Sequence, residues 1–100
     1  RAPGRRCILI GPNDIAFLCP PELRIALDPG SRFSLFPMGP VRGASRGLTW
    51  PIDGIDFLPG GRLGTSNRVE GGVVELTMEA PLMLVILPRA ALGAAISALC

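Results

Sequence analysis

Residues 73–79 read VVELTME, and from Val74 onwards apolar and polar side chains alternate. Successive side chains of a β-strand point to opposite faces of its sheet, so the apolar residues of this stretch would share one face. Residues 23–28, LRIALD, follow the same alternation, with Leu23, Ile25 and Leu27 on the apolar side. Both stretches predict strands with one face against a core and the other in water.

Turn-forming residues separate such stretches along the whole chain. Glycine and proline account for 13 and 11 of the 100 residues, well above their average usage. They cluster at residues 11–14, 19–21, 28–30, 37–40, 51–54, 59–61, 70–72 and 80–81. Proline fixes one dihedral of a turn and glycine permits positive φ, so each cluster predicts a turn. Short segments between turns about 8–12 residues apart are typical of a β-sandwich or barrel.

Three further segments are apolar without a clear alternation. Residues 7–10 and 15–18 are short apolar runs, which predict buried strands. Residues 82–87 are apolar at every position. We therefore expect both faces of this last strand to be covered, either inside a packed sheet or at a subunit interface.

Only the C-terminal segment has a helical pattern. Residues 90–99 are rich in alanine and carry Leu92, Ile96 and Leu99 at spacings of four and three. A chain of 10.5 kDa has room for one core. The prediction is an all-β fold with one domain over residues 1–100. It is a jelly-roll-like β-sandwich of short antiparallel strands with one short C-terminal helix.

The composition excludes several kinds of chemistry. The chain has no histidine, which rules out Ser-His-Asp or Cys-His catalysis and a histidine-ligated zinc site within these residues. It has no lysine, which a Walker-type phosphate loop requires. Its ten basic residues are arginines, scattered singly apart from Arg1, Arg5 and Arg6, and the net charge is +2. We expect no catalytic residue, no metal site and no nucleic-acid partner for this chain.

Cysteine usage and the apolar C-terminal segment bear on the compartment. Cys7, Cys19 and Cys100 lack the CxxC spacing of a metal knuckle and are predicted to be free thiols of a reducing cytosol. Residues 80–100 have about the length of a membrane span, but Pro88 and Arg89 lie in the middle. A central arginine costs roughly 2.5–3.5 kcal/mol on insertion scales. The expectation is a cytoplasmic protein with no membrane partner.

The polar segment at residues 60–68, GGRLGTSNR, invites a phosphate-loop interpretation. Neither the GxGxxG nor the GxxxxGK[ST] spacing is present and no helix pattern follows, so a hairpin loop is favoured. Trp50, the only tryptophan, is interpreted as a core residue, with a stacking wall for a flat ligand as the alternative. Asp53, Asp56 and Glu70 have no metal-specific spacing and are interpreted as solvated loop acids.

Four segments follow one another in a recognisable order: residues 34–39 (SLFPMG), 47–52 (GLTWPI), 64–67 (GTSN) and 81–87 (PLMLVIL). This order resembles the C-terminal domain of the thiamine pyrophosphokinase (thiamine diphosphokinase) family. There an SL-x-P-x-G strand, a GL-x-W/Y strand, a TSN loop and a closing apolar strand occur in succession. The resemblance covers about residues 31–87.

The resemblance implies a transferase whose ATP-binding N-terminal α/β domain is absent from this chain. Such a kinase transfers pyrophosphate from ATP to thiamine, giving thiamine diphosphate and AMP. ATP and Mg²⁺ would be bound mainly by the absent domain, so this chain alone is expected to be inactive. The family also implies a homodimer formed through the sandwich. The alternative hypothesis is a non-catalytic β-sandwich that serves only assembly or dimerisation.

The resemblance also implies the residues that bind thiamine. Ser66 and Asn67 match the loop that contacts the pyrimidine ring, and short side chains with donors and acceptors suit the edge of such a ring. Thr65 belongs to the same loop, and Glu70 falls where some members place a loop or ring-stacking residue. Trp50 matches a family aromatic, for which we expect a mainly structural role.

Overall fold

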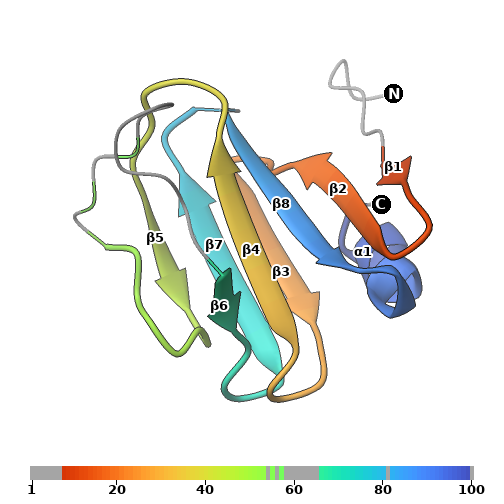
Figure 1. Cartoon of the computed structure of the whole chain (residues 1–100). Coiled ribbons are helices and arrows are strands. Elements are labelled where there is room, and N and C mark those ends of the chain that lie inside the picture. The colour runs from red at the N-terminus through yellow and green to blue at the C-terminus, as the bar shows by residue number, and fades with distance from the viewer. Residues whose placement is uncertain (1–7, 54, 56, 58–65, 81, 100) are drawn as a thin grey trace.

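The computed structural model describes residues 8–53, 55, 57, 66–80 and 82–99. These residues form two antiparallel β-sheets with one short helix at the C-terminal end (Figure 1). The predicted all-β fold with a C-terminal helix is therefore confirmed.

The larger sheet has five strands in the order β1-β2-β8-β4-β6. Their bounds are Leu9–Ile10 (β1), Asp14–Leu18 (β2), Met83–Pro88 (β8), Arg32–Pro37 (β4) and Ser66–Arg68 (β6). The central strand β8 aligns Val85 with Phe17 of β2 on one side and with Leu35 of β4 on the other. All three side chains are buried, so this row forms the middle of the core-facing surface.

The smaller sheet has three strands in the order β3-β7-β5. Their bounds are Glu22–Ala26 (β3), Val73–Met78 (β7) and Gly43–Arg46 (β5). The alternation predicted for residues 73–79 is confirmed, because the side chains of Val74, Leu76 and Met78 are buried while those of Glu75 and Thr77 are exposed.

The two sheets enclose one apolar core. It contains buried side chains from both sheets, including Phe17, Phe33, Ile25 and Leu76. Burying a side chain of this size contributes roughly 1.5–3 kcal/mol, so the aromatic and branched residues at the sheet centres dominate the stability.

The predicted C-terminal helix is present as a 3₁₀ turn over Arg89–Ala91 followed by α1 over Leu92–Leu99. Helix α1 contacts edge strand β3, and its buried residues are Ala95 and Leu99. Gly93 lies on the exposed side, where a methyl group would meet open space. Among the described residues, no helix has the length and apolar character needed to cross a membrane.

The prediction that residues 7–10 form a buried strand is wrong for the part of it that the structure describes. Leu9 and Ile10 form β1, but they are 68% and 55% exposed because β1 is a two-residue edge strand paired only with β2; Cys7 lies outside the described residues. On β8, Met83, Val85 and Leu87 are buried, whereas Leu84 and Ile86 on the other face are only half-buried. Among the described residues, that second face of the larger sheet is less covered than the first, and its coverage at a subunit interface stays a prediction.

Candidate functional site

Two of the sequence motifs lie side by side in the structure. Residues 47–50 run antiparallel to the residues at and after β6. The backbone N–H of Glu70 donates to the carbonyl of Gly47 (2.7 Å), Leu48 forms a bridge with Val69, and the N–H of Thr49 donates to the carbonyl of Arg68 (2.9 Å). The chain thus brings the tryptophan segment against the strand that carries Asn67.

Gly47 makes this approach possible. Its φ is +88°, a conformation that residues with a side chain adopt only with strain. A Cβ at this position would lie 2.0 Å from the carbonyl oxygen of Val73 on β7. Only glycine fits here, so the chain can leave β5 sharply and turn towards β6.

Asn67 connects β6 to Trp50 through its side chain. Its Oδ1 accepts hydrogen bonds from the backbone N–H groups of Trp50 (3.0 Å) and Arg68 (2.9 Å). Its Nδ2 donates to the carbonyl oxygen of Trp50 (2.7 Å). The residue is 5% exposed. A buried carboxamide is costly unless it is paired, and these bonds pair both of its polar atoms.

Trp50 itself is 58% exposed, so the interpretation of this residue as part of the core is wrong. Its backbone is nevertheless held from both sides. Asn67 bonds its N–H and carbonyl, while Pro51 restricts the conformation of the residue before it. Two residues further on, the N–H of Ile52 donates to Oγ of buried Ser45 (3.1 Å). The indole is an exposed aromatic surface on a fixed piece of backbone.

Ser45 and Asp53 complete the support of this segment. The backbone N–H of Ser45 donates to Oδ1 of Asp53 (2.9 Å), so this carboxylate is engaged with β5. The sequence analysis did not single out Ser45, because strand β5 reads GASR and carries no alternation that would mark an inward position. Asp56 lies outside the described residues.

The other predicted site residues are placed as follows. Ser66 lies in β6 opposite Ser34 of β4, so residues 66–68 are a strand, and the prediction of a hairpin loop is wrong for them. Thr65 lies outside the described residues. Glu70 is exposed and bonds Gly47 through its backbone. The structure thus brings Ser66, Asn67, Trp50 and Glu70 to one edge of the sandwich.

The acid–base chemistry of the described residues is limited. Burial raises the pKa of the Cys19 thiol to about 12, so this cysteine is a neutral core residue. Within the described part of the chain, no three acidic or cysteine side chains come together in a way that could hold a metal ion.

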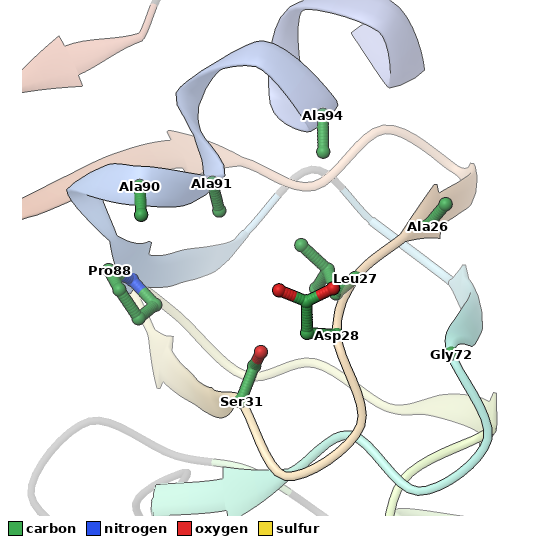
Figure 2. Close-up of a pocket in the computed structure, with 9 residues that line it drawn as sticks. All are labelled: Ala26, Leu27, Asp28, Ser31, Gly72, Pro88, Ala90, Ala91 and Ala94. Atoms are coloured by element: carbon green, nitrogen blue, oxygen red, sulfur yellow. The ribbon is translucent and has the colours of Figure 1, made fainter.

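A cavity of about 480 Å³ lies elsewhere, between the C-terminal helical segment and the β3–β4 loop. Figure 2 shows the Asp28 carboxylate and the Ser31 hydroxyl pointing towards the turn that carries Ala90 and Ala91. No predicted site residue lines it. Sequence analysis had no signal for this cavity, because it arises where the last helix packs beside β3.

The chain was compared with known proteins. A family model described as "Thiamin pyrophosphokinase, vitamin B1 binding domain" matches residues 22–83. No curated protein matches the chain. Solved structures of similar fold include a thiamine pyrophosphokinase from Bacillus subtilis, with 18% identity and a TM-score of 0.71 over 83% of this chain. Thiamin pyrophosphokinases from Candida albicans (19% identity, TM-score 0.71, 83% covered) and Geobacillus thermodenitrificans (13%, 0.66, 81%) are also similar. The match spans only 41%, 33% and 39% of these three chains, respectively.

Proposed function

Because the chain belongs to the thiamin pyrophosphokinase, vitamin B1 binding domain family, we propose that it supplies the thiamine site of an enzyme that converts thiamine and ATP into thiamine diphosphate and AMP. The family match covers most of the chain, and the shared fold of thiamine pyrophosphokinases supports it. Those solved proteins are more than twice as long as this chain, so the nucleotide-binding part of the enzyme would lie in another domain.

The observation that carries the proposal is the exposed Trp50 indole beside β6. Thiamine has an aminopyrimidine ring and a cationic thiazolium ring. A flat cation over a tryptophan face gains about 0.5–2 kcal/mol, and aromatic stacking adds a similar amount. The hydroxyl groups of Ser66 and Thr65 and the carboxylate of Glu70 would bond polar groups of the ligand. Direct contact by Asn67, which the family resemblance implies, would use the second N–H of Nδ2, because Oδ1 already accepts two hydrogen bonds and the other N–H is donated to Trp50.

The part played by this chain in the reaction is positional. Holding the hydroxyethyl oxygen of thiamine at a fixed place raises its effective concentration towards the phosphoryl group to be attacked. Magnesium would neutralise the charge of the nucleotide, but the described residues include no cluster of acids that fits it.

We further propose that the chain forms a homodimer through the less covered face of the larger sheet. The register places Leu18, Leu84 and Phe36 in one row across β2, β8 and β4, and Met38 follows on the same side. Leu18, Phe36 and Met38 are large apolar side chains left exposed. Patches of this kind mark interaction sites in soluble proteins. The same face is the observation that favours the second candidate function, a purely assembling sandwich.

Nucleotide analysis of the parent enzyme to which we propose this chain belongs tests the function. With ATP, Mg²⁺ and thiamine, we expect AMP and thiamine diphosphate to form together, and Trp50→Ala to weaken thiamine binding by about tenfold. Trp50→Phe, which keeps an aromatic face, should lose less. If the folded parent releases no AMP and the chain does not bind thiamine, the assembly function is the better account. Light scattering of Phe36→Asp tests the dimer: a mass unchanged from a wild-type dimer would contradict the proposed face.

A further inference from the structure

We infer that Asn67 serves ligand binding as a positioning residue: it fixes Trp50 in place through its carboxamide and does not itself contact the ligand. This inference rests on the proposed function and assigns the thiamine-contacting role to Trp50. It differs from the role that the family resemblance implies for Asn67, which is direct contact with the pyrimidine ring.

The backbone pairing beside β6 stops one residue before Trp50. Between residues 47–49 and 68–70, backbone groups pair with one another, ending with the bond from Thr49 to Arg68. At the next position, the polar groups of Trp50 bond the side chain of Asn67. The backbone of Asn67 lies opposite Phe33 in the sheet. The carboxamide therefore continues the pairing by one residue and acts as a substitute for a backbone amide.

The arrangement of polar groups at Trp50 selects asparagine as its partner. The backbone of Trp50 presents an N–H donor and a carbonyl acceptor. One planar carboxamide pairs with both, because its Oδ1 accepts from the N–H (3.0 Å) and its Nδ2 donates to the carbonyl oxygen (2.7 Å). An aspartate of the same shape keeps the acceptor but cannot donate to the carbonyl. Alanine has no polar atom, serine has a single oxygen where the carboxamide offers separate donor and acceptor atoms, and glutamine is one methylene longer. Asparagine is thus explained by Trp50 without any ligand contact.

Asn67 is 5% exposed while Trp50 is 58% exposed, so a ligand arriving from solvent meets the indole first. When the backbone that carries a side chain is already fixed, less conformational entropy is lost on ligand binding. Ser45 accepts a hydrogen bond from the N–H of Ile52 at its Oγ and donates its own N–H to Asp53. These bonds hold residues 52 and 53, whereas the backbone of Trp50 is held by Asn67.

The experiment compares Asn67→Ala, Asn67→Asp and the matched control Ser45→Ala, which removes the neighbouring buried bond to Ile52. Trp50 is the only tryptophan and the chain has no tyrosine, so emission from the purified chain reports on this residue alone. In the absence of ligand, we expect the fluorescence anisotropy to fall in both Asn67 variants and to stay at the wild-type value in Ser45→Ala. Unchanged anisotropy in folded Asn67→Ala would overturn the inference. If that variant does not fold, Asn67→Asp supplies the same comparison.

A double-mutant cycle on thiamine affinity in the parent protein tests the ligand part. Asn67→Ala should weaken binding by about tenfold, and adding it to Trp50→Ala should cost less than a further twofold, because Asn67 acts through Trp50. Additive losses would show that Asn67 contacts the ligand independently. Absence of thiamine binding in the wild-type parent would refute the proposed function, while the anisotropy would still decide whether Asn67 positions Trp50.

Discussion

Replacing Gly47 with alanine should be among the most destabilising single changes in this domain. Two separate costs are visible at this position: φ is +88°, and a Cβ would lie 2.0 Å from the carbonyl oxygen of Val73. A left-handed conformation costs an alanine about 1–2 kcal/mol. Overpacking against a neighbour that cannot move away adds roughly 1–3 kcal/mol. The expected loss is about 2–5 kcal/mol, a large part of the 5–15 kcal/mol that typically holds a domain together.

The chain provides matched controls that separate the two costs. Gly30 has nearly the same φ, +86°, but a Cβ there would meet nothing within 4 Å, so Gly30→Ala should lose only the conformational cost of about 1–2 kcal/mol. Gly71 has neither feature, and Gly71→Ala should be close to neutral. Urea unfolding of the three variants with a shared m-value gives the comparison. A loss at Gly47 no larger than that at Gly30 would refute the steric argument.

Two further predictions concern charge. Burial raises the pKa of Cys19 from 9.0 to about 12, so the unfolded chain releases this proton at a lower pH than the folded chain does. The free energy of unfolding should therefore be highest below pH 9 and fall by roughly 1.4 kcal/mol per pH unit as the pH rises towards 12. The chain has no lysine or tyrosine to titrate in that range. Urea unfolding in a Cys7→Ser, Cys100→Ser background measures the effect. An equal dependence of the unfolding free energy on pH in Cys19→Ala would contradict the prediction. The ion pair between Arg32 and Asp14 is exposed, so Arg32→Ala should cost less than about 1 kcal/mol in the same assay, and a larger loss would mean that the pair is not screened as we assume.

The fold was largely predictable because its signals are local. The alternation in residues 73–79 and 23–28 identifies two strands of the smaller sheet, and the glycine and proline clusters mark the turns between strands. The C-terminal helix follows from its alanine content. The apolar run of β8 predicted that both of its faces are covered, but such a run gives no sign of whether the chain itself or a second subunit covers each face.

The candidate site was predictable in its residues but not in its geometry. Sequence motifs pointed to Trp50 and Asn67, but Trp50 was predicted to lie in the core and is exposed, and the burial of Asn67 was not predicted. Their pairing depends on a turn at Gly47 that brings residues distant in sequence together, and periodicity does not report such contacts. Ser45 was not found because a polar residue in a short strand has no distinctive pattern.

The bond between Asn67 and Trp50 has a consequence for how the domain comes apart. Asn67 is carried by β6 of the larger sheet, whereas Trp50 lies on the segment that leaves β5 of the smaller one. The carboxamide thus joins the two layers at a place where their main chains stop pairing. If the two sheets separate at that edge, the bonds that hold the Trp50 backbone break at the same time, and the proposed ligand contact is no longer ordered. In amide hydrogen exchange, the protection of the Trp50 N–H should therefore change together with that of β6. A ligand bound at Trp50 should then raise the stability of the contact between the two sheets.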